Sequence, residues 1–165
     1  MCDEWHEGLP LAYGPDAPIY WYGLSPEERT TRFELNEDTA ILDGEHYFIR
    51  GRIEIPIREF DDPFVWVAWS SLSRDDFAKL SEVWLSPDRE RLPPMFGWLS
   101  SELEGYPSTV NLKVNVHQRA PGARPVIEVE PTDHPLAVEQ RAGMSWERVQ
   151  ELAELILHGT GGGAV

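Results

Sequence analysis

An acid and an imidazole are neighbours at Asp133 and His134, within the run Pro131-Thr-Asp-His-Pro-Leu-Ala-Val-Glu-Gln140. A carboxylate beside a histidine can orient a general base, and Glu139 is a second acid of the run, within ten residues of Glu130. Prolines on both sides of the pair restrict the backbone. The same residues also fit a rigid turn in which Asp133 bonds to the backbone and His134 caps or packs. The run therefore gives catalytic candidates and a structural alternative.

Two further histidines join this set if the fold brings them together. His46 follows the dipeptide Asp43-Gly44 and a glutamate, and His117 ends a predicted strand. The turn itself explains Asp43, because aspartate before glycine is typical of a two-residue hairpin turn. An enzyme interpretation, in its simplest form a small hydrolase, requires histidines and an acid to converge in one pocket.

The chain carries no established catalytic motif beside these residues. It contains no Gly-x-Ser-x-Gly elbow, no phosphate-binding glycine loop and no His-Glu-x-x-His helix. The sequence therefore favours a protein that binds over one that catalyses, without deciding between them.

A polar strand face provides candidate binding residues. Lys113 and His117 alternate with apolar residues along one predicted strand, and Glu128 and Glu130 lie across the predicted hairpin. These side chains could line a binding groove or form a solvated sheet face with ion pairs between strands. Lys113, Glu128 and Arg50 are the candidate binding residues.

Cys2 and His6 have the spacing of a Cys-x3-His half site. Thiolate and imidazole are normal zinc ligands, but a closed tetrahedral zinc site has four ligands. The remaining donors would have to come from His46, His117 or His134. The alternative is a mobile free thiol, so no cofactor is expected in the chain as printed.

The elements that must position these residues form an α+β pattern. The Asp43-Gly44 dipeptide predicts a hairpin within residues 39–57, and the run 64–69, apolar on both faces, predicts a central strand. Alternation predicts two more strands, 109–117 and 126–130. Matching apolar to apolar residues gives a register that pairs Val114 with Ile127, Leu112 with Val129 and Lys113 with Glu128.

Helix signals complete this pattern. Ser73 and Ser145 are predicted N-caps of two amphipathic helices, and Ser25 precedes a shorter helical segment with proline at its first position. Residues 96–99 fit either a short strand or a packed turn. We predict a single α+β domain over residues 1–158, with an antiparallel sheet of about five or six strands, in a meander and hairpins, packed against at least two helices. Residues 1–37 are predicted to wrap the core irregularly, and residues 159–165 to form a flexible tail.

Composition limits the classes of partner. The chain has 165 residues and a net charge of −15, from 29 acidic and 14 basic residues, with 41% hydrophobic residues. Such a chain folds, but it repels nucleic acid and anionic lipid at long range. Acidity suits a basic protein partner or a bound cation, although a charged surface that only confers solubility is the alternative.

Cysteine content and hydropathy bear on location. A single cysteine excludes an internal disulfide framework. No apolar run approaches the roughly 20 residues that span a bilayer, and the first residues lack the basic and then apolar pattern of a secretory leader. We expect a cytoplasmic protein that associates with no membrane. Seven tryptophans are many for one small core, so an exposed aromatic patch and a homodimer stay open.

Six motifs form a recognisable set along the chain: His6-Glu-Gly-Leu-Pro-Leu11, Tyr20-Trp21, Asp43-Gly-Glu-His-Tyr-Phe-Ile-Arg-Gly51, Phe96-Gly-Trp-Leu99, Asn111-Leu-Lys113 and Glu130-Pro-Thr-Asp-His-Pro-Leu-Ala-Val-Glu-Gln140. This set resembles the bacterial family called domain of unknown function 2199, from Cys2 to about His158. The resemblance implies no established activity.

Members of that family look as if they begin with a Cys-x-x-Cys-Gly-x-x-His knuckle. Cys2 and His6 can be placed on its second cysteine and its histidine, whereas Asp3 stands at the glycine position and the first cysteine would lie before Met1. The resemblance therefore implies zinc only for a longer form of the protein with an upstream cysteine.

The preferred functional hypothesis is a small acidic cytosolic binding or interaction protein. An inhibitor or immunity-type protein for a basic toxin would be one instance. The alternatives are a small hydrolase-like enzyme that uses His134, Asp133, His46, Glu130 or His117, and a zinc-binding protein in a longer form.

Overall fold

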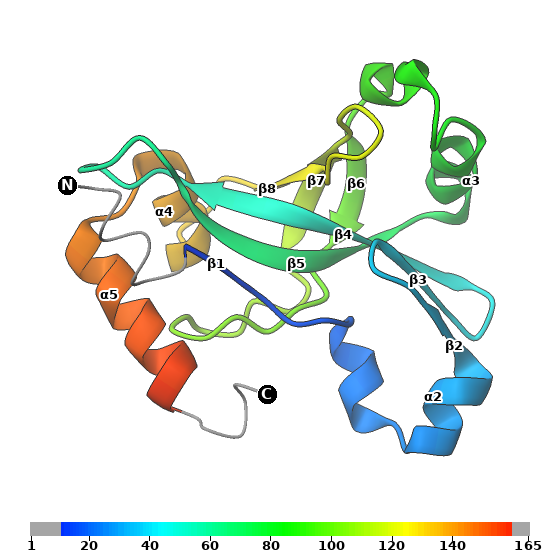
Figure 1. Cartoon of the computed structure of the whole chain (residues 1–165), viewed down its shortest axis with the longest axis horizontal. Helices are drawn as coiled ribbons and strands as arrows, with labels where there is room; N and C mark the ends of the chain where they lie inside the picture. Colours follow the sequence, from blue (N-terminus) through cyan, green and yellow to red (C-terminus); the bar gives the residue numbers. More distant parts are fainter. Residues whose placement is uncertain (1–10, 160–165) are drawn as a thin grey trace.

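The computed structural model describes residues 11–159, which form a single α+β domain (Figure 1). In these residues eight strands form one sheet: β1 (Ala12–Tyr13), β2 (Phe33–Leu35), β3 (Thr39–Leu42), β4 (His46–Ile55), β5 (Phe64–Leu72), β6 (Met95–Trp98), β7 (Lys113–His117) and β8 (Val126–Val129). Four α-helices accompany the sheet in the same residues: α2 (Pro26–Arg32), α3 (Arg74–Glu82), α4 (Pro135–Ala142) and α5 (Trp146–Glu154). No helix within residues 11–159 has the length and apolar character needed to cross a bilayer.

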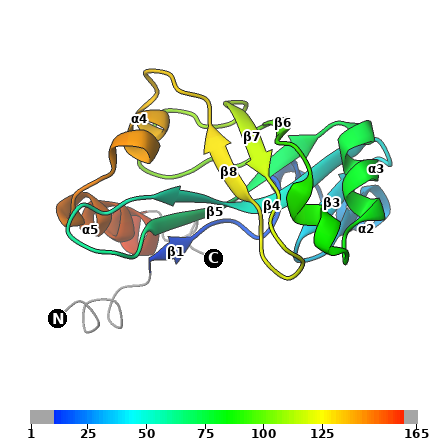
Figure 2. The same ribbon diagram turned by 90° about the horizontal axis from the view of Figure 1, so that it is seen from above.

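The two longest strands of the described sheet, β4 and β5, lie next to each other within it. They pair antiparallel from Tyr47 and Leu72 at one end to Ile55 and Phe64 at the other. Most of β5 is buried on both faces, as its continuous apolar sequence predicts. Helices α4 and α5 lie toward one end of this strand pair and α2 and α3 toward the other (Figures 1 and 2).

The predicted hairpin at Asp43-Gly44 is confirmed. Both residues have positive φ, 55° for Asp43 and 71° for Gly44. Positive φ at both central positions gives the turn the twist that β3 and β4 need, and the Glu45 N–H donates to the Leu42 carbonyl at 3.1 Å.

The sheet is mixed and larger than the antiparallel sheet of five or six strands that we predicted. β1 pairs parallel with β5, and β4 pairs parallel with β8 through Arg52 and Val126. These parallel pairings join segments that are far apart in the sequence, so a hairpin turn motif cannot predict them. The segment before residue 37 contains the predicted helix after Ser25, which is α2, and is otherwise more regular than expected, because it also contributes β1, β2 and the 3-10 helix η1 (Ile19–Gly23).

The predicted register of β7 and β8 is wrong by two residues. Val114 pairs with Val129 and Asn115 with Glu128, so Lys113 does not pair with Glu128. A shift of two residues keeps the same side chains on the same face, so matching apolar residues cannot distinguish the two registers. The strand also starts at Lys113 and not near residue 109, because Asn111, with φ 73°, forms a turn before it.

The sheet curls back on itself beyond β6. An isolated antiparallel bridge joins Ser70 on β5 to Leu99, and the Ser100 N–H donates to the Trp69 carbonyl at 2.7 Å. The main hydrophobic core lies between these strands and the helices, with members from β4 to β8, α3, α4 and α5. A second, smaller cluster around Trp69 and Phe48 packs beneath the segment of η1, β2 and β3.

The helices begin at polar caps. Ser73 Oγ accepts from the Asp76 N–H at 3.1 Å, and Ser145 Oγ accepts from the Arg148 N–H at 3.1 Å, which confirms both predicted N-caps. Helix α4 was not predicted as a helix. It begins after His134, whose Nδ1 accepts from the Leu136 N–H at 3.1 Å, because Pro135 suits the first helical position.

Candidate functional site

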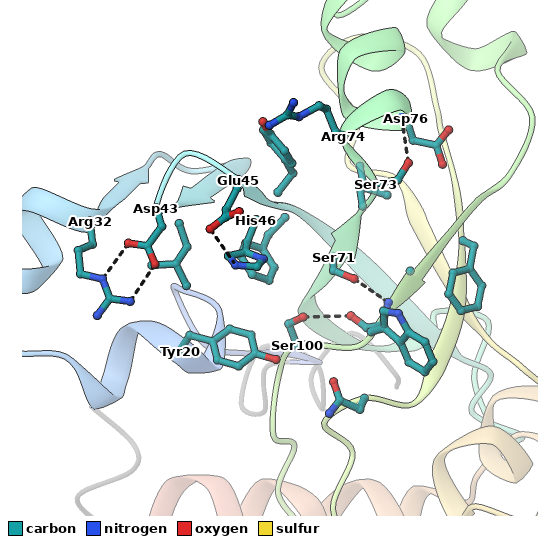
Figure 3. Close-up of a pocket in the computed structure, with 18 residues that line it drawn as sticks. Tyr20, Arg32, Asp43, Glu45, His46, Ser71, Ser73, Arg74, Asp76 and Ser100 are labelled. Carbon is teal, nitrogen blue, oxygen red and sulfur yellow. Dashed lines mark hydrogen bonds and ion pairs between the residues drawn. The ribbon is translucent and has the colours of Figure 1, made fainter.

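A cleft of about 820 Å³ lies between β6, the β3–β4 turn and the start of α3 (Figure 3). We call it the aromatic cleft; its lining residues include Tyr20, Arg32, Asp43, Glu45, His46, Ser71, Ser73, Arg74, Asp76, Phe96, Trp98 and Ser100. Its volume is in the range of sites that hold small molecules or short peptide segments.

Three aromatic side chains that line the cleft are substantially exposed to solvent. Tyr20 is 42% exposed, and Phe96 and Trp98 are each 43% exposed. Phe96 and Trp98 share the outer face of β6, because Met95 and Gly97 alternate with them and are buried. The two rings meet edge to face with centroids 5.2 Å apart, and Tyr20 lies 5.8 Å from the Phe48 ring. This edge of the sheet thus presents aromatic faces to solvent.

The close approach of β6 to β5 forms the floor of the cleft. Ser71 Oγ accepts from the Trp98 N–H at 2.9 Å, and Ser100 Oγ donates to the Trp98 carbonyl at 3.0 Å (Figure 3). A Cβ atom on Gly97 would collide with the Ser70 hydroxyl and the Ser71 carbonyl oxygen. These contacts fix the backbone that carries Trp98.

One ion pair stabilises the opposite wall. Arg32 donates through Nε and Nη2 to the two carboxylate oxygens of Asp43, each at 2.8 Å (Figure 3). This hydrogen bonding lowers the pKa of Asp43 and raises that of Arg32. The pair joins α2 to the hairpin turn, so Asp43 has a structural partner besides its role in the turn.

The remaining charged side chains of the cleft are available for a ligand. Among the residues that the structure describes, the Glu45 carboxylate contacts only His46, at 3.9 Å between Oε2 and Nε2. Arg74 and Asp76 lie in the first turn of α3 and make no ion pair with a described residue. The cleft therefore offers carboxylates and a cation at its rim together with aromatic rings.

The cleft holds no nucleophile paired with a base among the described residues. Ser71 and Ser100 hydrogen bond to the backbone of Trp98, and Ser73 caps α3. His46 contacts Glu45 and no serine. None of these three serines is therefore placed next to a general base that could activate it.

The three candidate histidines have different surroundings. His46 lines the aromatic cleft. His117 Nε2 lies 2.8 Å from Glu128 Oε1 on the outer face of β7 and β8, beside a different cavity. His134 caps α4, and its Nε2 lies 3.1 Å from the Ser108 carbonyl. The described structure does not bring them into one pocket.

The other candidate residues are also dispersed. Asp133 is exposed, and Glu130 is partly buried with its N–H donating to the Lys113 carbonyl at 3.0 Å. Lys113 Nζ lies 5.9 Å from the Trp98 ring centroid, so this candidate binding residue stands beside the aromatic cleft. Arg50 lies on β4, pairs with Asp16 at 3.1 Å and stacks over Trp69.

The metal candidates Cys2 and His6 lie outside the described residues. Within residues 11–159, no group of three or more histidine, cysteine, aspartate or glutamate side chains is placed to hold a metal ion. The zinc hypothesis for a longer form stays a prediction.

Sequence reasoning missed a polar network behind α4. Tyr106 donates to Glu139 Oε1 at 2.7 Å and accepts from the Trp66 indole at 3.2 Å, while Arg148 Nε donates to Glu139 Oε2 at 2.8 Å. Burial and the bond to Glu139 raise the pKa of Tyr106. Its members come from four separate segments, so no local spacing marks them, and its contacts make it a structural tie between α4 and α5.

Comparison with known proteins places the chain in a family. The family called domain of unknown function 2199, described as an uncharacterized protein conserved in bacteria, matches residues 1–144. The chain belongs to this family. The match spans every residue of the aromatic cleft, from Tyr20 to Asn111. Searches of curated proteins and of solved structures found no match.

Proposed function

We propose that this member of the family is a binding protein whose aromatic cleft holds a basic segment of a protein partner. The observation that carries the proposal is the convergence of Tyr20, Phe96 and Trp98, all substantially exposed, on one cleft of about 820 Å³. Aromatic faces attract lysine and arginine side chains through cation–π interactions and are enriched where proteins meet. Lys113 already occupies such a position over Trp98.

Charge supports a basic partner. Glu45 and Asp76 are the cleft carboxylates without an arginine partner among the described residues, whereas Asp43 is paired with Arg32. The net charge of −15 steers cationic partners toward the whole molecule and repels polyanions. An inhibitor of a basic toxin would be one protein of this class. We further propose that this interaction takes place in the cytoplasm, because a chain with a single cysteine suits a reducing compartment.

The hydrolase alternative has less support. It needs histidines and acids in one pocket, whereas His46, His117 and His134 each have separate contacts in the described residues. Only His46 lines the aromatic cleft.

The test uses two short peptides of equal length, one rich in lysine and arginine and one rich in glutamate. We expect the basic peptide to bind and the acidic peptide not to bind, by calorimetry at low ionic strength. Replacing Trp98 with alanine should weaken binding by about tenfold or more, since a central aromatic residue contributes at least about 1.4 kcal/mol at such sites. Equal binding of both peptides would contradict the proposal.

Matched controls separate the cleft from general surface effects. Leu85→Ala removes another exposed apolar side chain, outside the cleft, and should leave the affinity unchanged. The double variant Glu45→Gln and Asp76→Asn should weaken the affinity for the basic peptide severalfold. The double variant Glu90→Gln and Glu147→Gln, which removes the same charge outside the cleft, should have a smaller effect. Equal effects of the two double variants would mean that the peptide recognises only net charge.

A further inference from the structure

A second cavity gathers arginines in this strongly acidic chain. Its volume is about 580 Å³, and it is lined by Arg50 and Arg52 from β4, Arg89 from the 3-10 helix η2 (Pro87–Arg91), and Arg119 and Arg124 from the loop between β7 and β8. We call it the arginine pocket. Its lining also includes the carboxylates Glu37 and Asp38, so the basic side chains exceed the acidic ones by three.

Three of these arginines have acidic partners. Arg50 pairs with Asp16 at 3.1 Å, Arg52 with Glu54 at 2.9 Å, and Arg124 with Asp38 at 3.4 Å. Arg89 and Arg119 form no ion pair with any residue in the range 11–159. Among the described residues, the Arg119 side chain donates only to the Arg124 carbonyl, at 3.3 Å.

Arg89 is the unusual member of the pocket. It is 3% exposed, its Nε donates to Gln118 Oε1 at 3.3 Å, and its guanidinium lies 4.0 Å from the Trp84 ring centroid. Burial lowers the pKa of Arg89, and the charge of Asp38 opposes this effect only in part. Arginine nevertheless stays charged in proteins, and a buried cation that forms no close ion pair is costly. An anion in the pocket would offset this cost.

We propose that the arginine pocket binds a small phosphorylated molecule, whose phosphate contacts Arg89 and Arg119. Guanidinium groups match phosphate oxygens in a bidentate geometry. Arg89 and Arg119, the two pocket arginines without an ion pair among the described residues, therefore suit a phosphate or diphosphate. Trp84 and Leu85 form an apolar wall, where the rest of the molecule can pack. The size of the pocket and the repulsion of polyanions by the whole chain favour a small ligand over nucleic acid.

Calorimetry with inorganic phosphate, pyrophosphate and citrate tests the proposal on the full chain. Pyrophosphate should bind with a Kd below about 1 mM at low ionic strength, more tightly than citrate, and added salt should weaken it. Binding should also raise the Tm, because the ligand binds only the folded state. Absence of pyrophosphate binding, or tighter binding of citrate, would overturn the assignment to phosphate.

Substitutions locate the site. Replacing Arg119, which lies on the exposed rim, with glutamine should weaken the affinity for pyrophosphate by about tenfold or more. Arg89→Gln should have the same effect on the affinity where the variant folds. Arg91→Gln removes the same charge from an exposed side chain of η2 outside the pocket and should change the Kd by less than about twofold. An equal loss in Arg91→Gln and Arg119→Gln would show diffuse attraction and overturn the proposal. Trp98→Ala should leave pyrophosphate binding intact, so the experiments can contradict the proposal for the arginine pocket and the proposal for the aromatic cleft independently.

Discussion

His134 uses both of its ring nitrogens at the start of α4. Because Nδ1 accepts from the Leu136 N–H, the proton must lie on Nε2, which can donate to the Ser108 carbonyl at 3.1 Å. The imidazole therefore caps a helix and ties it to the loop before β7. This is the structural alternative that the sequence left open for the Asp133-His134 pair.

Replacing His134 with alanine should lower the free energy of unfolding by about 1–2 kcal/mol, because it removes a helix cap and a second hydrogen bond. His134→Asn can keep the cap but not the contact to Ser108, so about half of the loss should remain. Urea unfolding measures both. His46→Ala, which removes an exposed histidine whose ion-pair contact is 3.9 Å from Glu45, should cost less than about 0.5 kcal/mol. Equal losses for His134→Ala and His46→Ala would refute this role.

Tyr106 should be among the last tyrosines to ionise, since burial and its bond to Glu139 raise its pKa above the ordinary value of 10.0. A raised pKa in the folded state means that the stabilisation is fully present below the unfolded-state pKa and is lost as pH rises above it. The stability difference between the natural protein and Tyr106→Phe should therefore shrink by up to about 1.4 kcal/mol per pH unit above about pH 10. Denaturant unfolding at a series of alkaline pH values checks this. A constant difference would contradict the raised pKa.

At the scale of elements, the sequence predicted the hairpin turn and the helix caps, which depend on a few neighbouring residues. The turn at Asp43-Gly44 and the caps at Ser73 and Ser145 are each set by a few neighbouring residues, and all were predicted. Strand pairing between distant segments was not predictable in this way. The register of β7 and β8 was missed by two residues, because both registers bury the same valines and isoleucine.

The approach of β6 to β5 makes Gly97 essential to the aromatic cleft. Gly97→Ala should lower the free energy of unfolding by about 2–4 kcal/mol, because its Cβ would collide with the Ser70 hydroxyl and the Ser71 carbonyl oxygen. It should also displace Trp98 and weaken binding of the basic peptide.

Gly23→Ala is the matched control for this substitution. A Cβ at Gly23 meets no atom within 4 Å, so this variant should stay within about 0.5 kcal/mol of the natural protein. Thermal and chemical unfolding compare the two. Similar stabilities for Gly97→Ala and Gly23→Ala would mean that β6 is not fixed to β5 as described.

At the scale of the whole molecule, composition predicted a folded domain and the strand and helix signals predicted its α+β class, but neither predicted the distribution of its charges. The net charge of −15 gives no hint that five of the twelve arginines surround one cavity. They come from β4, η2 and the loop before β8, which only the long-range pairing of the sheet brings together. The sequence did not predict the aromatic cleft either, because Tyr20 and Trp98 are far apart along the chain. The seven tryptophans had only left an exposed aromatic patch open.

The central claim is that the aromatic cleft binds a basic protein segment. The most direct test is an NMR titration of the ¹⁵N-labelled chain with the lysine- and arginine-rich peptide, with the indole signal of Trp98 assigned through Trp98→Phe. We predict saturable shifts of that indole and of amides around Phe96, Glu45 and Asp76, with no comparable change from the glutamate-rich peptide. Shifts that avoid the cleft, or that appear with protein concentration alone because a second copy occupies it, would contradict the claim.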